Sequence, residues 1–340
     1  MAYTTIDDPE LYFQTKLYTG TGSSLDVTLD GDEDMSPNLV WIKRRTNASD
    51  KHVFYDTVRG VQKRLMTSEN DAEDTQAQHV TAFNSDGFTV GTGGAVNTSS
   101  ETFVAWCWKE SADAGFDIVG FAGTGSARTV SHSLSAVPHV YIVKNRERAA
   151  NWLVYHHKNT TAPETDYLEL NNNPATADYP FWNDTSPTSS VFSVGPSGAN
   201  GDVVNADGEN IITYLFTEKQ GFSKFGSYTG NGHATNGPYV YTGFQPAWIM
   251  VRRAVGGTGN WMVVDNKRPG YNQEDNYKYD FKINNTDAER TSVTSADFFS
   301  NGFKVRTDST DWNTDGHTYV YMAFAHAPFV NSEGVPCNAK

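Results

Sequence analysis

Short apolar stretches of six or seven residues recur along the chain, and polar, glycine-rich segments separate them. Six of these stretches are 39–44, 102–108, 139–144, 210–216, 247–252 and 318–324. They are rich in Val, Ile and aromatic residues and are bounded by turn residues, which predicts buried β-strands. Apolar residues with a 3.6-residue period extend over no more than about two turns anywhere in the chain. We therefore expect an all-β protein.

The strands follow the same order three times. The motif aromatic-x-Gly-x-Gly opens each unit, at 18–22, 121–125 and 228–232. The period of about 105 residues is longer than a solenoid unit and suits a small β domain. We predict three tandem β-sandwich repeats, jelly-roll-like in type. Their boundaries are a leader at 1–16 and repeats at 17–115, 116–221 and 222–340, the last with a short C-terminal tail.

Turn signals give further local predictions. Segments 83–90 and 299–305 hold an Asp-Gly or Asn-Gly pair between apolar residues, which predicts β-hairpins. The middle repeat keeps the strand at 191–194 but lacks that pair. In the leader, Asp8 followed by proline predicts one capped helical turn. The joints at 109–115 and 218–222 are short, so we expect neighbouring repeats to stack.

The charge balance limits the possible partners. The chain has 26 basic and 40 acidic residues, a net charge of −14, which argues against nucleic acid and anionic membranes. The two cysteines, Cys107 and Cys337, make neither a disulfide scaffold nor a zinc site. We find no signal peptide and no apolar stretch of 18 residues. The expectation is a protein made in a cytoplasm that stays soluble and is not inserted into a membrane.

One segment resembles part of a calcium loop. Asp311, Asn313 and Asp315 place oxygen ligands at alternate positions before Gly316, as Ca²⁺ coordination requires. However, the twelfth position is Met322 rather than glutamate, and a strand follows. The alternative is an ordinary turn before the last strand. We expect no cofactor, with structural calcium as the open alternative.

Histidines offer a second possible metal site. His132, His139, His156 and His157 all lie in the middle repeat. The positions equivalent to His156 in the other repeats hold aspartate, so such a site would not recur. Half-buried imidazoles are the simpler interpretation.

Catalytic motifs are absent from the sequence. It contains no Gly-x-Ser-x-Gly elbow, no phosphate-binding loop and no Cys-His arrangement. Carboxylate pairs for glycoside hydrolysis are possible because acidic residues are plentiful, but no pair recurs between repeats. We expect a non-enzymatic protein, with depolymerase activity as the alternative.

Aromatic residues make up 13% of the chain. Five tryptophans fall on strand positions and are expected in the core: Trp41, Trp106, Trp152, Trp248 and Trp261. Others lie in predicted loops near Asn and Asp: Tyr179, Phe181, Trp182, Tyr271, Tyr277, Tyr279 and Trp312. Exposed rings beside polar groups suit either a carbohydrate surface or a contact between subunits. Both interpretations remain open.

Segments 117–134, 137–146 and 151–156 resemble an uncharacterised tandem β repeat. That repeat occurs in tail-fibre and other virion structural proteins of tailed bacteriophages, notably marine and cyanobacterial ones. The opening residues 3–14 are similar to the start of several such proteins. The resemblance implies location in a virion, and it supplies no catalytic residues.

These observations together favour a non-enzymatic virion structural protein, with a tail-fibre or receptor-binding role in host attachment expected first. Capsid decoration or a fibre-base role is the alternative, and a lectin-like carbohydrate-binding module or a polysaccharide depolymerase is another. Without heptads or Gly-X-Y runs, a head or plate is expected rather than a shaft. The expected partners are other proteins of the tail or capsid, copies of the chain in a homotrimer, and a host surface glycan.

Overall fold

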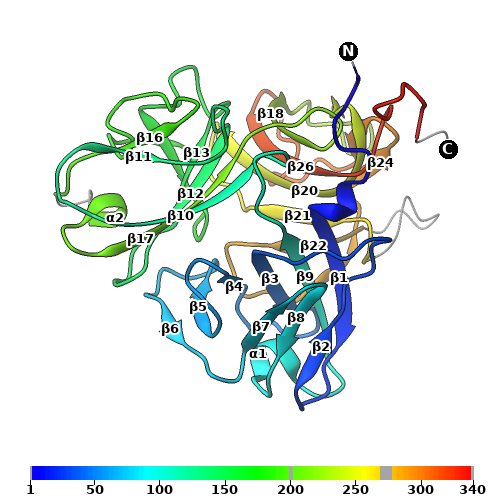
Figure 1. Cartoon of the computed structure of the whole chain (residues 1–340). Coiled ribbons are helices and arrows are strands. Elements are labelled where there is room, and N and C mark those ends of the chain that lie inside the picture. The colour runs from blue at the N-terminus through cyan, green and yellow to red at the C-terminus, as the bar shows by residue number, and fades with distance from the viewer. Residues whose placement is uncertain (1, 199–201, 269–277, 338–340) are drawn as a thin grey trace.

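The computed structural model describes residues 2–198, 202–268 and 278–337. Strands dominate this part of the chain, so the prediction of an all-β protein is confirmed (Figure 1). The helical elements are single turns: η1 (Pro9–Leu11), α1 (Gly94–Asn97) and α2 (Asp202–Asn205).

Three large antiparallel sheets, each of six strands, are found among the described residues. The first has the order β1 (Phe13–Thr19), β9 (Thr102–Trp108), β3 (Leu39–Arg44), β4 (Val53–Asp56), β5 (Lys63–Met66), β6 (Asp74–Thr75). The second has the order β10 (Phe116–Ala122), β17 (Asn210–Phe216), β12 (Val140–Asn145), β13 (Leu153–His156), β14 (Asp166–Glu169), β15 (Ala177–Asp178). The third has the order β18 (Ser223–Thr229), β26 (Thr318–Pro328), β20 (Phe244–Val255), β21 (Met262–Asp265), β22 (Lys278–Lys282), β23 (Arg290–Val293).

Each large sheet is accompanied by a small one. These are β2 (Leu25–Val27), β8 (Gly87–Val90) and β7 (Val80–Asn84); β11 (Arg128–Ser131) and β16 (Val191–Val194); and β19 (Tyr239–Tyr241), β25 (Gly302–Val305) and β24 (Ala296–Phe299). In every large sheet, the strand that comes first along the chain pairs with the strand that comes last along the chain. We call residues 13–108, 116–216 and 223–328 units 1, 2 and 3. β1 begins inside the predicted leader, and the other predicted boundaries fall between units.

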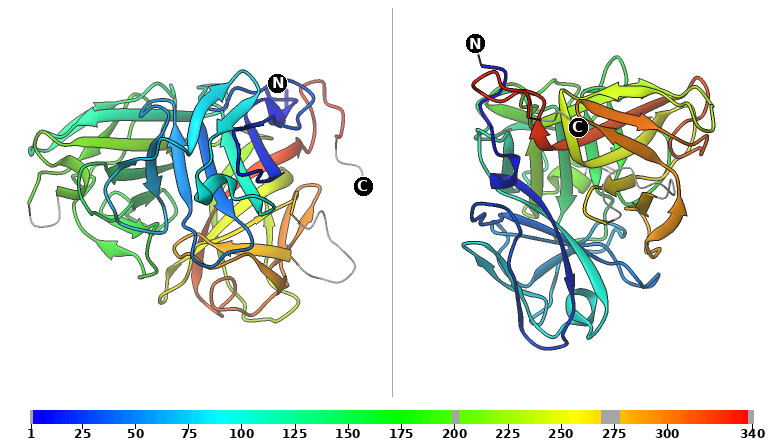
Figure 2. Two further views of the ribbon diagram at one scale, coloured as in Figure 1. Left: turned by 90° about the horizontal axis from the view of Figure 1, so that it is seen from below. Right: turned by 90° about the vertical axis from the view of Figure 1, so that its right-hand side faces the viewer.

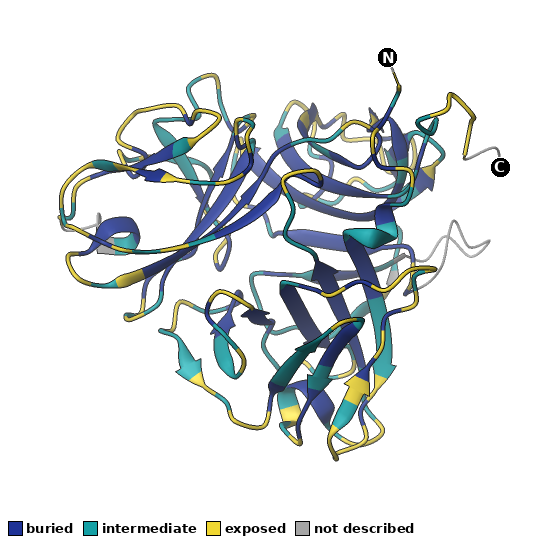
Figure 3. Ribbon diagram, viewed as in Figure 1, coloured by how far each residue is buried: buried dark blue, intermediate teal, exposed yellow. Residues whose placement is uncertain are grey.

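The inner faces of the three large sheets share one core. Trp106 of unit 1 lies 6.3 Å from Trp248 of unit 3, and Phe54 lies 5.7 Å from Trp152 of unit 2, between ring centroids. The outer face of each large sheet packs on its own small sheet around a separate core. The buried centre where the three lobes meet is visible in Figure 3. The five tryptophans predicted to be in the core are all buried.

The units close a ring, because each contacts the next in the same way. Three equivalent backbone hydrogen bonds join them: Glu289 N to Arg45 O at 2.8 Å, Glu73 N to Arg146 O at 2.7 Å, and Thr176 N to Ala254 O at 3.0 Å. Unit 3 thus contacts unit 1, unit 1 contacts unit 2, and unit 2 contacts unit 3. Figure 2 shows the three lobes around the common centre.

The local predictions agree with the structure. β7–β8 and β24–β25 are the expected hairpins, with the glycine on the first position of the second strand rather than inside the turn. The Asp8 side chain accepts a hydrogen bond from Glu10 N at 2.9 Å and caps η1. In unit 2, where the turn pair is missing, the small sheet has two strands instead of three.

Candidate functional site

A buried ion pair of unit 1 lies at its seam with unit 2. Asp56 and Arg59 form an ion pair of 2.5 Å, and both side chains are fully buried. The Tyr214 hydroxyl of unit 2 donates to the same carboxylate at 2.6 Å. Arg59 also contacts Glu73, which pairs with Arg146 of unit 2 at 2.8 Å. Charge and hydrogen bonds together therefore tie the two units.

Unit 3 repeats this arrangement at its seam with unit 1. Asp265 and Arg268 pair at 2.7 Å with both side chains buried, and Trp106 Nε1 of unit 1 donates to Asp265 at 3.0 Å. Arg268 and Arg45 both reach Glu289. Burial disfavours the charged guanidinium, but Asp265 and Glu289 outweigh it and raise the pKa of Arg268. The pair therefore stays ionised inside the protein.

In unit 2 the equivalent position is His156, which faces unit 3. Its Nδ1 accepts from Lys158 N at 3.1 Å, so Nε2 carries the proton and donates to Tyr321 O at 3.1 Å. His157 lies beside it and donates to Phe225 O at 2.7 Å, while its ring contacts that of His139 at 4.5 Å. Burial lowers the pKa of His156 to about 3 and that of His157 to about 4. These imidazoles are uncharged at neutral pH and connect unit 2 to unit 3.

Acid is therefore expected to weaken this seam. The unfolded chain binds protons at these histidines below about pH 6.5, whereas the folded chain resists them until about pH 3–4. The free energy of unfolding should fall across that window, by up to about 1.4 kcal/mol per pH unit for His156. Urea melts of the wild type and of His156→Gln, whose amide can keep the bond to Tyr321, check this. Equal slopes of stability against pH for the two proteins would contradict it.

A basic side chain at one equivalent position of each unit reaches a backbone carbonyl of a neighbouring unit. Lys43 Nζ donates to Thr286 O at 3.1 Å, Lys144 Nζ to Asn70 O at 3.3 Å, and Arg252 Nη2 to Pro174 O. Burial lowers the pKa of Lys43 to about 8 and that of Lys144 to about 7. These buried basic side chains also connect neighbouring units, because each donates a hydrogen bond to a main-chain oxygen across a seam.

One carboxyl pair can be compared with the catalytic pair of a hydrolase. Burial, with a hydrogen bond from and the charge of Asp117, raises the pKa of Glu110 to about 7. Glycosidases hold their two carboxyl groups about 5–9.5 Å apart, to admit a sugar or a water. Glu110 lies in the segment that links units 1 and 2, and Asp117 lies near the start of β10. The interaction with Asp117 that contributes to this shift makes the two carboxyl groups part of the contact between these units.

Two predicted surface rings are buried, so their assignment to an exposed loop was wrong. Phe181 is 3% exposed and Trp182 is 0% exposed. Gly195 N bonds to Phe181 O just as Gly91 N bonds to His79 O in unit 1, so Trp182 occupies the position of buried Val80. Its large ring fills the outer core of unit 2, where the small sheet lacks a third strand. Tyr179 is half-buried and packs on Phe181, with ring centroids 4.5 Å apart.

The remaining predicted rings are also unsuited to a free surface. Trp312 is 0% exposed and belongs to the outer core of unit 3, which corrects its assignment to a surface. Tyr279 is half-buried, and the Arg45 guanidinium of unit 1 lies 6.0 Å from its ring centroid. Tyr271 and Tyr277 lie outside the described residues.

The segment interpreted as a possible calcium loop is a turn held by a buried asparagine. Asn313 Oδ1 accepts from Asn231 N at 2.8 Å, and its Nδ2 donates to His233 O and Thr307 O. Asp311 instead accepts from Asn260, and Asp315 is exposed. Among the described residues, no three His, Cys, Asp or Glu side chains are grouped to hold a metal ion. The arrangement favours the turn over the calcium site.

A buried asparagine holds the equivalent turn in every unit, and we call this arrangement the asparagine brace. Asn97 and Asn205 are also 0% exposed, and each accepts from the residue between the two glycines of its Gly-x-Gly segment, Thr21 or Thr124. The first glycine is required because a Cβ there would lie 2.0–2.2 Å from a carbonyl oxygen of the turn that carries the asparagine. This explains the spacing that opens each unit.

Replacing Asn205 by alanine should lower the free energy of unfolding by about 1–3 kcal/mol, because three backbone groups, one buried and two partly buried, lose their partner. Urea unfolding measures the change, and Asn172→Ala at an exposed position is the control.

Melts of the wild type in CaCl₂ or EDTA separate the two interpretations of 311–316. A calcium site would raise the Tm in CaCl₂, and the brace alone would not.

A groove lies beside the seam of units 2 and 3, near both ends of the chain. Two hollows of 460 and 540 Å³ adjoin there, since Tyr3 and Gln220 line both. The first is also lined by His139, Glu218, Ser223, Lys224, Tyr241, Thr242 and Gly243, and the second by Ala2, Ser332, Glu333 and Gly334. The Tyr3 hydroxyl donates to Gly243 O at 2.6 Å, and Ser332 donates to Asp7. The first bond ties the N-terminal segment to unit 3, and the second ties the C-terminal segment to the N-terminal one.

Exposed rings continue from this groove. Among the described residues, the exposed aromatic side chains are Tyr239 at 46%, Tyr241 at 55% and Phe299 at 41%. The Tyr241 and Tyr3 hydroxyl oxygens are 3.5 Å apart. Sequence reasoning missed these residues, although the alternation Tyr-Val-Tyr at 239–241 is the pattern of a strand with one exposed face.

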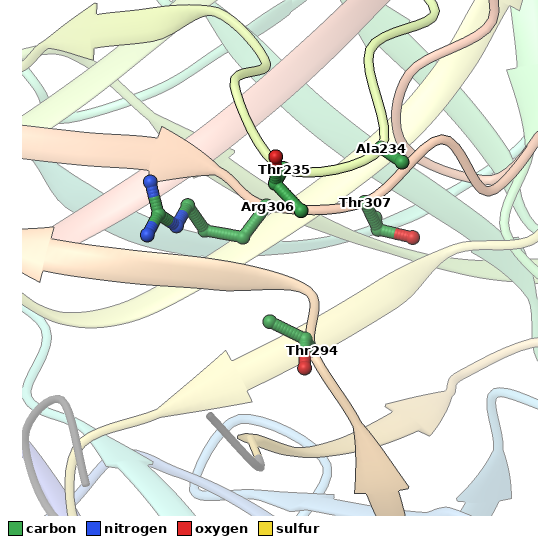
Figure 4. Close-up of a pocket in the computed structure, with 5 residues that line it drawn as sticks. All are labelled: Ala234, Thr235, Thr294, Arg306 and Thr307. Atoms are coloured by element: carbon green, nitrogen blue, oxygen red, sulfur yellow. The ribbon is translucent and has the colours of Figure 1, made fainter. Parts of the chain in front are cut away.

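A separate hollow, of 300 Å³, lies on unit 3 and is lined by Arg306, three threonines and one alanine (Figure 4). Arg306 Nε pairs with Asp297 at 3.0 Å, which neutralises the cation. This hollow therefore has little charge to attract an anion.

The fold and its polar clusters define an all-β protein in which three units close around one core and buried charges lie at the seams. The chain belongs to the family described as Domain of unknown function (DUF7483), whose model matches residues 8–328. That match extends through all three units. No curated protein matches the chain. Over the described residues, no helix has the length and apolar character needed to cross a membrane.

Proposed function

We propose that the chain is a non-enzymatic structural protein of a bacteriophage particle, and that it serves the tail as a fibre or receptor-binding component. One observation carries the proposal: the buried ionic clusters described above lie at seams between units. We infer that they favour one arrangement of the units, because separating the partners of a buried pair is costly. The resemblance of unit 2 to a virion repeat supports the location.

The closed arrangement of the three units supports a role as a rigid structural block. The seams combine a shared apolar core with buried ion pairs, so the three lobes are fixed relative to one another. A body of this kind presents outward-facing small sheets and loops to other virion proteins. We propose tail and capsid proteins as its partners.

The homotrimer expected from the sequence stays a prediction. The inner faces of the three large sheets already cover one another within a single chain, so this core needs no second copy. Light scattering on the purified chain decides between the two: a mass of three times 37.5 kDa supports the trimer, and 37.5 kDa contradicts it.

Immunogold labelling of intact particles with an antibody against the purified chain tests the location. Gold at the distal tail supports the proposed role. Gold over the head would replace it with capsid decoration, the second candidate. Particles without gold would overturn the virion proposal, and release of reducing ends from bacterial polysaccharide would then identify a depolymerase.

A further inference from the structure

We infer that the row of rings formed by Tyr3, Tyr239, Tyr241 and Phe299, together with the groove beside it, binds a neutral oligosaccharide. We call this surface the ring row. This site would give the outer surface of the proposed virion protein a class of ligand, and to that extent the inference rests on the proposed function.

The rings form a continuous line on one side of unit 3. Phe299 and Tyr239 lie edge to face with centroids 6.0 Å apart. Tyr239 and Tyr241 project from the same face of β19, at alternate positions of a strand at the edge of its sheet. Tyr241 then meets Tyr3 through the two hydroxyl groups at 3.5 Å. The line ends in the groove that Tyr3 and Gln220 share.

The fold does not require these rings, because the other units do without them. Val240 pairs with Phe303, Val27 with Phe88 and Val130 with Phe192, so the three valines are equivalent and buried. The positions flanking them hold Asp26 and Thr28 in unit 1 and Thr129 and Ser131 in unit 2, all exposed. Tyrosines at both flanking positions of unit 3 therefore point to a ligand.

The chemistry of the surface suits a sugar. A tyrosine ring offers an apolar face to the C–H groups of a pyranose and a hydroxyl group to its oxygens. The exposed Gln220, which lines both hollows, adds an amide of the kind that fixes a polar ligand. The two hollows, 460 and 540 Å³, are within the range of roughly 300–1,000 Å³ typical of small-ligand sites.

The charges near the row favour a neutral ligand. Lys224 Nζ and Glu218 Oε2 pair at 2.8 Å, so each cancels the other. The carboxylate of Glu333, which lines the second hollow, disfavours an anionic ligand. Burial lowers the pKa of His139, which keeps that ring uncharged at neutral pH. The core of a protein–protein contact would surround the rings with apolar side chains. Polar side chains are found here instead, including Asn301, which accepts from the Tyr239 hydroxyl.

The test uses the purified full chain on a printed array of neutral microbial oligosaccharides, followed by titration of the strongest neutral oligosaccharide. In the double variant Tyr239→Thr/Tyr241→Ser, the tyrosines are replaced by the residues that unit 2 carries at these positions. Val255→Thr removes another exposed apolar side chain of unit 3 and is the matched control. We expect the double variant to lose affinity at least about tenfold, with its Tm and the binding of the control unchanged.

Three outcomes would overturn the inference. The first is an array without binding by the wild type. The second is equal affinity of the wild type and the double variant, which would place the sugar elsewhere. The third is a double variant that keeps glycan binding but is lost from purified particles, which would identify the rings as a protein contact. Since the array uses purified protein and the gold labelling uses particles, failure of one leaves the other intact.

Discussion

Replacing Trp106 by alanine should cause a larger loss of stability than any other single substitution at the seams. The side chain is 0% exposed, and its ring meets Trp41 and Trp248 at centroid distances of 5.4 and 6.3 Å. Alanine leaves a cavity where units 1 and 3 meet, which costs about 3–5 kcal/mol. It also removes the indole donor from buried Asp265. Urea unfolding, followed by circular dichroism, measures the loss.

Trp106→Phe is the matched variant, because it keeps most of the ring volume and removes the hydrogen bond. We expect it to lose about 1–3 kcal/mol, as for other buried groups left without a partner. A loss below about 1 kcal/mol for alanine would contradict the shared core. It would show that the units fold without their common centre.

Asp265→Ala should be nearly as severe. The substitution leaves the Arg268 guanidinium buried with Glu289 alone, and removal of one partner from such a pair costs about 3–5 kcal/mol. The free energy of unfolding of the variant should fall by that amount. Asp56→Ala in unit 1 should behave alike, since Arg59 and Glu73 repeat the arrangement.

The control is the partly exposed pair Lys282–Asp287, separated by 3.4 Å with the Asp287 side chain 51% exposed. Asp287→Ala should change stability by about 0–1 kcal/mol. The double variant Asp265→Leu/Arg268→Met should regain most of the loss, because it removes both buried charges. An equal loss for Asp265→Ala and Asp287→Ala would contradict a special role for the buried pair.

Strands were predictable where the chain signals them locally. The stretches 102–108 and 210–216 coincide with β9 and β17 because runs rich in β-branched and aromatic residues are buried at every position after the first. The hairpins and the leader turn were predictable for the same reason, since their signals lie within a few residues of each other.

The ring of units could not be predicted in this way. Its seams join residues such as Arg45 and Glu289, and neither shows a periodic pattern that would point to the other. The burial of residues in predicted loops was equally hard to predict. Trp182 lies in a predicted loop, and only the hydrogen bond from Gly195 N shows that it is equivalent to the buried Val80. At the candidate binding site, the alternation at 239–241 carried the signal, but its meaning depends on knowing that Thr129 and Ser131 are the equivalent residues.

The seam between units 1 and 3 also affects how the chain folds during synthesis. Lys43 donates to Thr286 O, and Arg45 pairs with Glu289. A ribosome adding about 5–20 residues per second needs on the order of 10–50 s to make the later partner after the earlier one. During that time Trp41 and Trp106 have no neighbours from unit 3 to cover them. A chain released early would therefore be prone to aggregate, and chaperones have a defined apolar surface to shield until synthesis ends.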